Sequence, residues 1–457
     1  MIVMKFGGTS VESASAIERA AGIVRARLDR RPAVVVSAMG KTTNKLLALA
    51  RSAAQGRRKE AIQQIQDLRD YHSREARQVV PLAERAELDL LLDDHFQELS
   101  ELVKGLSVLG EVTPRSLDAI SSYGERLSSH IVARAFRHFG MDAVHLDSRS
   151  VVITDDRFTQ AAPLAGAAYP KVAAALPPLL ESGKVVVMGG FIGSTESGVT
   201  TTLGRGGSDF SASLVGAGIG AEEIQIWTDV DGMLTCDPTV LPGGHRVKVI
   251  SFDEAAELAY FGAKVLHPST VLPAMNLRIP VRILNSRRPE SEGTLIVPQA
   301  PATSNPAKSI ACKKNLTVVD IASTRMLMAH GFLHKIFEIF DRYETPVDMV
   351  TTSEVSVSLT IDQTGRLPDI TRELSRFAEV RHENNQAILC IVGDNIRYTP
   401  GVAARIFQAV RHINVRMISQ GASLRNVSFV VQESDLRPAV EALHAAFFTE
   451  LDPEIFE

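Results

Sequence analysis

The sequence predicts an α/β protein that carries a pair of small α+β domains toward its C-terminal end. In the first part of the chain, short β-branched runs that end in glycine alternate with amphipathic helical segments. That alternation is typical of a parallel sheet with helices on both faces, a three-layer αβα domain. From Gly331 onward, a segment with one helix and two strands occurs twice. Each copy is too small to bury its own apolar face, so the two copies are expected to pair.

The strands of the first domain are read from runs of apolar and β-branched residues. They are residues 1–6, the AVVVSAMG run at 33–40, the VVVMGG run at 185–190 and the EIQIWTDV run at 223–230. Residues 13–29 are rich in alanine and carry arginines on one face, which predicts a helix after the first strand. Residues 55–111 are charged, have no strand pattern and are interrupted once, at Pro81. This segment predicts a helical hairpin inserted into the α/β unit, with its charges on solvated faces.

Composition narrows the class of protein. A chain of 457 residues with 45% hydrophobic residues can form two to four domains with substantial cores. The formal net charge of -4 gives no reason to expect a nucleic acid or an anionic membrane as partner. We expect no membrane span and no secretion signal, because apolar runs are short and Lys5 to Gly8 interrupt the N-terminal one. The cysteines, Cys236, Cys312 and Cys390, are far apart, which favours a reduced, cytoplasmic protein without a disulfide framework.

The first strand ends in KFGGTS, Lys5 to Ser10, and this motif is a candidate phosphate site. Gly7 and Gly8 lack Cβ atoms, so the backbone can turn sharply and bring N–H groups close to an anion, while Lys5 adds a positive charge. The spacing matches neither the Walker A pattern nor the dinucleotide fingerprint. A glycine turn after a strand is often only structural, so the motif needs support from other loops.

Other loops at the carboxyl ends of the predicted strands supply that support, and ligands of open parallel sheets bind at such ends. Ser37 is followed by the polar loop Gly40 to Asn44, and Gly189 and Gly190 end another strand. The segment TTTLGRGGSD places Arg205 among three glycines, where its planar guanidinium is suited to a carboxylate or phosphate. Ser208 and Asp209 begin the following helix, and a simple capping role for them is the plain alternative.

Four motifs in order along the chain, KFGGTS, LGRGGSD, WTDVDGMLTCDP and FGAKVLHP, resemble those of aspartate kinases in the amino acid kinase family. The resemblance extends from Met1 into the C-terminal repeats. It implies a catalytic domain over 1–297, a linker at 298–310, which is rich in proline, alanine and serine, and two C-terminal ACT (ferredoxin-like) domains at 311–385 and 386–457.

The resemblance implies transfer of the γ-phosphoryl group of ATP to the side-chain carboxylate of L-aspartate, giving 4-phospho-L-aspartate. Such a reaction needs alignment and charge neutralisation more than covalent help from the protein. Lys5, Lys264 and the Gly7–Gly8 backbone with Ser10 are expected to hold phosphate, and Asp209 to orient the lysines. Mg²⁺ is expected to bind through the nucleotide phosphates and water, without a dedicated protein cage.

Substrate and nucleotide residues follow from the same resemblance. Those expected at aspartate are Ser37, Thr43, Glu125 for the amino group, Arg205 for the α-carboxylate, and Ser208. Those expected at ATP are Thr228, Asp229, Leu234, Lys264 and Val265. Some relatives carry a tyrosine and an arginine where this chain has Leu234 and Thr239, so its ATP contacts differ in detail. His267 lies at a turn before Pro268, where a structural role is expected.

The ACT resemblance implies an amino-acid effector. Residues of the first repeat match the lysine-binding positions of lysine-sensitive aspartate kinases: Met326, Phe332, Leu333, Asp348, Thr352, Ser353 and Glu354. Asp348 and Glu354 suit a ligand with two amino groups. The second repeat has Gly421, Ala422 and Ser423 in the corresponding loop and is expected to support the interface.

Several alternatives stay open at this point. Threonine, or both amino acids, could be the effector in place of lysine. A homodimer through the ACT domains is expected, and a dimer of dimers is a further option. The chain could also be a related kinase acting on glutamate, acetylglutamate or a nucleoside monophosphate. Finally, it could be a non-catalytic sensor on a kinase-like scaffold, which would predict loss of Lys5, Arg205, Asp209 or Lys264, and all four are present.

Overall fold

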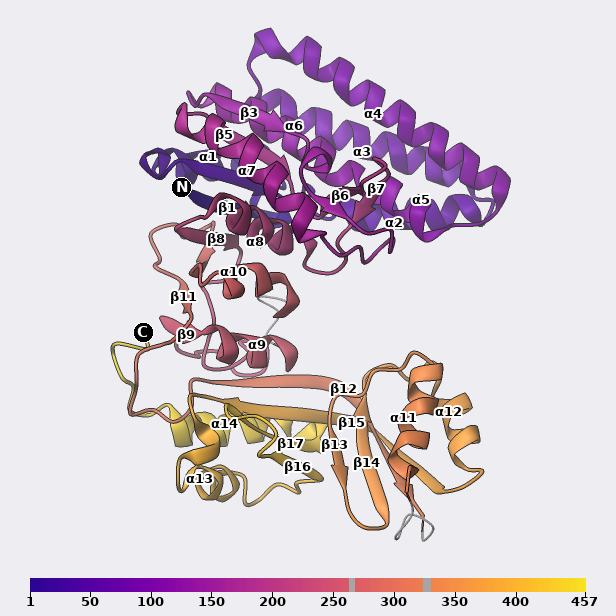
Figure 1. Cartoon of the computed structure of the whole chain (residues 1–457), viewed down its shortest axis with the longest axis vertical. Helices are drawn as coiled ribbons and strands as arrows, with labels where there is room; N and C mark the ends of the chain where they lie inside the picture. The colour runs from indigo at the N-terminus through magenta and orange to yellow at the C-terminus, as the bar shows by residue number, and fades with distance from the viewer. Residues whose placement is uncertain (263–267, 324–329) are drawn as a thin grey trace. The chain divides into compact units, whose positions relative to one another are not determined.

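The computed structural model describes residues 1–262, 268–323 and 330–457 (Figure 1). The chain forms two compact units, the first comprising Met1–Gly232 and Val265–Pro298 and the second Met233–Lys264 and Gln299–Glu457. Among the residues described, no helix combines the length and the apolar character needed to cross a membrane.

The first unit is built around a largely parallel sheet, as the sequence predicts. Its strands lie in the order β3-β5-β2-β1-β8-β10-β11, and only β11 runs antiparallel to its neighbour in this order. Their bounds are β1 (Ile2–Phe6), β2 (Pro32–Val36), β3 (Ala143–Leu146), β5 (Val185–Gly189), β8 (Glu223–Thr228), β10 (Val281–Asn285) and β11 (Thr294–Val297). A small second sheet contains β4 (Ile153–Thr154), β6 (Ile192–Thr195) and β7 (Thr200–Thr202). The parallel strands end at one edge, where their loops can share a site.

Helices cover both faces of this sheet. One face packs against a helical layer that includes α1 (Ala14–Arg25), α2 (Thr42–Ala54), α3 (Arg58–Val79), α4 (Leu82–Leu109), α5 (Pro114–Ser121) and α6 (Tyr123–His138). The other packs against α7 (Ala165–Glu181), α8 (Gly207–Ile219) and α10 (Leu272–Asn276). The helices α3 and α4, which Figure 1 shows as a long pair and which meet at Pro81, correspond to the helical hairpin expected at 55–111.

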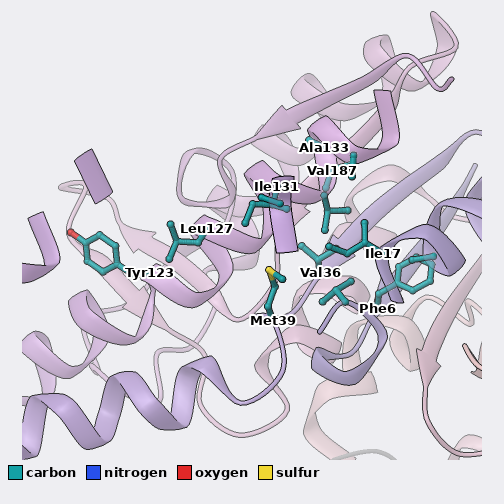
Figure 2. Close-up of a cluster of buried hydrophobic side chains, with 14 of the residues drawn as sticks. Phe6, Ile17, Val36, Met39, Tyr123, Leu127, Ile131, Ala133 and Val187 are labelled. Atoms are coloured by element: carbon teal, nitrogen blue, oxygen red, sulfur yellow. The ribbon is translucent and has the colours of Figure 1, made fainter. Parts of the chain in front are cut away.

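Alternation along β1 decides which side chains enter the core. Ile2, Met4 and Phe6 belong to the apolar cluster on the α1 and α6 face. Figure 2 shows Phe6 in this cluster with Ile17 of α1 and Val36 of β2. Because successive strand residues point to opposite faces, Lys5 points to the α8 face. The first strand therefore anchors the sheet with one set of residues and presents its lysine with the other.

The second unit contains the two repeats in one antiparallel sheet, ordered β13-β14-β12-β15-β17-β16. Its strands are β12 (Ser309–Ala322), β13 (Val350–Thr352), β14 (Ser356–Ile361), β15 (Glu379–Val392), β16 (Met417–Gln420) and β17 (Asn426–Gln432), and the short β9 (Val249–Ser251) lies earlier in the chain. Its helices are α9 (Phe252–Tyr260), α11 (Phe332–Arg342), α12 (Leu367–Leu374), α13 (Val402–Ala409) and α14 (Leu436–Phe447).

The long strands β12 and β15 belong to both repeats. They pair from Ser309 opposite Val392 to Ala322 opposite Glu379, with irregular register between Lys313 and Val318. One half of this pair continues into β14 and the other into β17. The boundary expected from the sequence at 385/386 falls within β15, and the N-terminal half of β12 completes the second repeat.

Residues 233–264 also group with the second unit. Ile310 N–H donates to the Thr235 carbonyl (2.8 Å), and the Ser309 hydroxyl donates to the Leu234 carbonyl (2.7 Å). These bonds tie the segment to the start of β12. The chain therefore passes from the first unit to the second after Gly232, returns to the first, and leaves it again after Pro298. The sequence predicts only the last of these crossings, near Val297.

Candidate active site

The carboxyl edge of the parallel sheet in the first unit contains a cavity of about 310 Å³. It is formed by the loops that follow β1, β2 and β5, by the first turn of α6, and by the start of α8 with the loop before it. The residues lining it are Lys5, Gly8, Ser37, Ala38, Gly40, Thr43, Glu125, Phe191, Gly204, Gly206, Gly207, Ser208 and Asp209. Residues from five separate sequence segments thus meet in one place, where ligands bind in open parallel sheets.

An ion pair between Lys5 and Asp209 lies in this cavity. The Lys5 Nζ is 2.7 Å from Asp209 Oδ1, and the two side chains are 11% and 13% exposed. Lys5 comes from the end of β1, and Asp209 from the first turn of α8. A carboxylate in the first turn of a helix is stabilised by the helix dipole, and here it also holds the lysine in the cavity. The geometry fits an orienting role for Asp209.

The turn after β1 requires a glycine at position 8. A Cβ on Gly8 would lie 2.7 Å from the Gly40 carbonyl oxygen and 3.0 Å from that of Ala38. Gly8 lines the cavity, whereas Gly7 donates its N–H to the Trp227 carbonyl (3.0 Å). Ser10 is buried, and its hydroxyl lies 2.8 Å from that of Ser286. Of the expected phosphate residues in this turn, Lys5 and Gly8 line the cavity, whereas Gly7 and Ser10 hold the turn to neighbouring strands.

Glu125 is the most unusual titratable group of the site. It lies in the first turn of α6, is only 3% exposed, and accepts a hydrogen bond from the Ala38 N–H at Oε1 (3.1 Å). Its Oε2 is buried and has no hydrogen-bond partner in the described residues. Burial raises the pKa of Glu125 to about 8, although the Ala38 N–H and the nearby Lys5 charge oppose that rise. A cationic ligand group would both satisfy this oxygen and favour its ionised form.

The other expected substrate residues divide into two groups. Ser37, Thr43 and Ser208 line the cavity with Glu125. Arg205 does not line it: its side chain is exposed, although Gly204 and Gly206 on either side are in the wall. Both of these glycines have positive φ, 74° and 72°, so the loop adopts a backbone that side chains disfavour.

Phe191 is a wall residue that the sequence does not predict. It follows the Gly189–Gly190 pair, and its own φ is +64°. Its N–H donates to the Ser211 hydroxyl (2.9 Å), and its carbonyl accepts from the Leu203 N–H (2.9 Å). The only sequence signal for it is its position directly after the glycine pair at a strand end.

The expected nucleotide residues lie partly outside the described region. Thr228 ends β8, and its hydroxyl donates to Asp229 (3.3 Å) at the same edge of the sheet. The Thr228 carbonyl accepts from the Ser286 N–H at 2.8 Å. Leu234 belongs to the second unit. Lys264 and Val265, together with His267, lie outside the described residues.

The expected effector residues lie in the first repeat of the second unit. Phe332 begins α11 and is buried, whereas Leu333 is exposed. Asp348 is close to Lys313, whose Nζ lies 2.6 Å from its Oδ1, and its Oδ2 is buried without a hydrogen-bond partner in the described residues. Burial raises the pKa of Asp348 and the Lys313 charge opposes this.

The remaining effector residues surround the turn between β13 and β14. Thr352, Ser353 and Glu354 are exposed there, and the Ser353 N–H donates to the Ser356 carbonyl (2.8 Å). Met326 lies outside the described residues.

Comparison with known proteins agrees with this architecture. Residues 1–285 match the amino acid kinase family, and residues 389–447 match an ACT domain. Aspartokinase 2, chloroplastic, of Arabidopsis thaliana is 40% identical over 469 residues, which cover 99% of this chain and 85% of that protein. Lysine-sensitive aspartokinase 3 of Escherichia coli (strain K12) is 37% identical over 463 residues, 98% of this chain and 99% of that protein.

Solved structures give the same result. E. coli aspartokinase III in complex with aspartate and ADP (R-state) matches with a TM-score of 0.84 and 36% identity, over 98% of this chain and 100% of that one. Its complex with lysine and aspartate (T-state) matches with a TM-score of 0.82, also at 36% identity, over 98% and 99% of the two chains. The fold and these matches define an amino acid kinase with an attached ACT module. The chain belongs to the amino acid kinase family, and within it to the aspartokinases, which are ATP-dependent aspartate kinases.

Proposed function

We propose that the cavity at the carboxyl edge of the parallel sheet is where this chain phosphorylates the side-chain carboxylate of L-aspartate with ATP. The observation that carries the proposal is the meeting of the Lys5–Asp209 ion pair with the buried carboxylate of Glu125 in one cavity. The first two groups suit a transferring phosphoryl group, and the third suits the ammonium of an amino acid.

In the proposed reaction, an oxygen of the aspartate side-chain carboxylate attacks the γ-phosphorus of ATP. The bond from that phosphorus to the β–γ bridging oxygen breaks, and ADP leaves. The attacking carboxylate is ionised, so no proton has to be removed and no general base is needed. Lys5 neutralises charge on the phosphoryl oxygens, Asp209 fixes the position of Lys5, and Lys264 supplies a second cation. Mg²⁺ fits as a group held by the phosphates and water, since it retains water readily, and it would neutralise further phosphate charge.

Substrate selection is assigned to two groups that recognise the two ends of the amino acid. Glu125 binds the α-ammonium, because its buried Oε2 needs a cationic or donor partner. Arg205 binds the α-carboxylate by rotation of its exposed side chain, with Ser208, Ser37 and Thr43 as hydroxyl contacts. Thr228, Asp229, Leu234 and Val265 are assigned to the nucleotide.

Release of ADP with different carboxylate acceptors tests the substrate assignment. We expect ADP release that depends on L-aspartate, with much slower release in L-glutamate or N-acetylglutamate. N-acetylglutamate lacks the ammonium for Glu125, and glutamate places its reacting carboxylate one methylene farther from the clamped end. ADP release that is independent of aspartate would contradict the proposal.

Lysine is the proposed feedback effector, bound in the first repeat through Asp348, Glu354 and their neighbours. Asp348 supports this role because one of its oxygens is paired with the Lys313 ammonium while the other is buried without a partner in the described part of the chain. A lysine ligand that binds one global state better than another shifts the enzyme toward that state. Measuring ADP release with lysine or threonine added separately tests the choice of effector. Inhibition by threonine and not by lysine would favour threonine as the effector.

The assembly and location are proposals as well. Each repeat contributes half of one sheet, which suits pairing with a second copy through the ACT domains, so a homodimer is proposed. The enzyme is placed in the cytoplasm: Cys236, Cys312 and Cys390 are free and buried, which suits a reducing compartment.

A further inference from the structure

Asp118 is a buried carboxylate in the first unit that does not line the cavity. It lies in α5, is 1% exposed, and accepts hydrogen bonds from two other segments. The Thr159 N–H lies 3.0 and 2.9 Å from its two oxygens, the Thr202 N–H donates to Oδ2 (3.0 Å), and the Thr202 hydroxyl donates to Oδ1 (2.5 Å). A buried carboxylate is expensive unless its oxygens are satisfied, and here both are.

Both hydrogen-bond partners of the Asp118 carboxylate lie next to the glycine loop of the cavity, residues 204–207. Thr202 is the last residue of β7, two positions before Gly204. Thr159 has a φ of +72°, and its carbonyl oxygen lies only 3.2 Å from where a Cβ of Gly204 would be. The Ala161 N–H also donates to the Thr202 carbonyl (2.9 Å), which joins the two segments. Asp118 therefore holds the backbone directly behind Gly204.

Asp118 is also close in the chain to Glu125, which lines the cavity from a different element than the glycine loop. The Asp118 carbonyl accepts from the Ser122 N–H (3.1 Å), and the chain continues from Ser122 into the first turn of α6, which carries Glu125. Glu125, whose carboxylate faces the cavity, is therefore only seven positions after Asp118, whose carboxylate holds the glycine loop.

We propose that Asp118 is a positioning residue that fixes the distance between the ammonium-binding and carboxylate-binding sides of the aspartate site. The inference rests on the proposed assignment of Glu125 and Arg205 to the two ends of aspartate. Asp118 does not line the cavity, and its carboxylate accepts hydrogen bonds from Thr202 and Thr159. These partners lie beside the loop of Arg205, so we expect Asp118 to act through that loop and to affect aspartate more than ATP. A shift of about 1 Å in the position of a substrate-binding group, caused by a change away from the reacting atoms, can lower catalytic efficiency about 100-fold.

Steady-state kinetics with each substrate varied separately test this role. Asp118→Asn places an amide group where N–H and O–H donors need an acceptor, so we expect the KM for aspartate to rise about 10- to 100-fold. The KM for ATP should stay within about twofold of the wild-type value, since no Asp118 partner lies at β8. Thr202→Val, which removes only the hydroxyl donor, should give a smaller rise, and Thr202→Ser should restore the wild-type value. Asp156→Asn, an exposed acid near Thr159, is the matched control and should leave both KM values unchanged.

The possible outcomes separate this inference from the site assignment. Arg205→Ala is measured in parallel: if it leaves the KM for aspartate unchanged, the site assignment fails, and the inference fails with it. If Arg205→Ala is defective but Asp118→Asn folds with a normal KM for aspartate, only the positioning role is overturned. If Asp118→Asn raises the KM values for aspartate and for ATP equally, Asp118 has a general structural role, and the positioning role is overturned. If Asp118→Asn does not fold, Thr202→Val decides: a rise in the KM for aspartate alone supports the inference, and an unchanged value overturns it.

Discussion

Lys5 combines two properties that seldom occur together: it is almost fully withdrawn from solvent, and it is charged within a cavity. If it faces the transferring phosphoryl group, its removal acts mainly on the transition state. We expect Lys5→Ala to lower kcat about 10²- to 10³-fold, the range for loss of one preorganised electrostatic group. The melting temperature should change little, because Asp209 borders the cavity, where water can replace the ammonium.

Lys104→Ala is the control for this substitution, because Lys104 is exposed on α4 and does not line the cavity. It should retain wild-type kcat and KM values. A Lys5→Ala variant with normal turnover would leave KFGGTS as a structural turn only.

Glu125 gives the site a specific pH dependence. Its pKa in the folded protein is about 8, so the carboxyl group is mostly protonated at neutral pH before a ligand binds. An ammonium ligand binds best to the ionised form, so the KM for aspartate should fall as pH rises toward 8 and then level off. In Glu125→Gln this part of the pH profile should disappear, and the KM should be high throughout. A Glu125→Gln profile identical to that of the wild type would contradict the assignment.

The same carboxyl group affects stability with a definite sign. Its pKa is higher in the folded protein, about 8, than its ordinary value of 4.5. Between pH 4.5 and pH 8 the folded state therefore binds more protons than the unfolded state. The contribution of Glu125 to the free energy of unfolding is fully present below about pH 4.5 and is lost as the pH rises to 8. At pH 8 Glu125→Gln should be more stable than the wild type, and at pH 5 the difference should be smaller. Thermal melts at the two pH values measure this difference.

At this scale, residue types predicted most of the cavity. Lys5 and Asp209 line it because β1 and the loop before α8 meet at the same edge of a parallel sheet, a consequence of topology that sequence can reveal, whereas Glu125, in the first turn of α6, is expected only from the family resemblance. Phe191 could not be predicted, since its place depends on a left-handed backbone that no residue type signals. The exposed position of Arg205 likewise depends on loop geometry and not on composition.

At the scale of elements, α9 is joined to the residue just before β12 by a buried ion pair. The Lys308 Nζ lies 3.1 Å from Glu254 Oε2, and both side chains are fully buried. Glu254 also completes the capping box with Ser251 at the start of α9. Lys308→Met leaves an uncompensated buried carboxylate, so we expect a loss of about 3–5 kcal/mol in the free energy of unfolding. Denaturant unfolding of the intact chain measures this loss.

Two further variants sharpen the result for this ion pair. Lys308→Met combined with Glu254→Gln removes both charges and should recover a large part of the loss. Lys335→Met, at an exposed lysine of α11, should be neutral. A loss below about 1 kcal/mol for Lys308→Met alone would place the pair in the class of weak surface salt bridges.

Element prediction succeeded where the pattern is local. The strands at β1, β2, β5 and β8 and the helices α3 and α4 follow from apolar periodicity within short windows. The sharing of β12 and β15 between the repeats depends on pairing between residues far apart in the chain, such as Ser309 and Val392. No local pattern carries that information, so a boundary between consecutive repeats was the natural expectation.

At the scale of the whole molecule, the proposed regulation predicts that lysine lowers the activity of the intact enzyme. Asp348→Ala should raise the lysine concentration needed for half-inhibition at least about 10-fold, since it removes a charge-assisted contact to an ammonium. Asp362→Ala is the matched control, because Asp362 also pairs with Lys313, 2.9 Å from its Nζ, but is not among the expected effector residues. Equal inhibition of Asp348→Ala and wild type would refute this site for lysine.

The central claim, phosphorylation of the aspartate side chain in the cavity of Lys5, Glu125 and Asp209, is tested most directly by trapping the product. An acyl phosphate reacts with hydroxylamine to give a hydroxamate, and mass spectrometry of the fragments distinguishes the side-chain from the α-carboxyl derivative. With ATP and L-aspartate, we predict the side-chain hydroxamate in amounts equal to the ADP formed, and its near-complete loss in Lys5→Ala. ADP release without a hydroxamate, or a hydroxamate at the α-carboxyl group, would contradict the account.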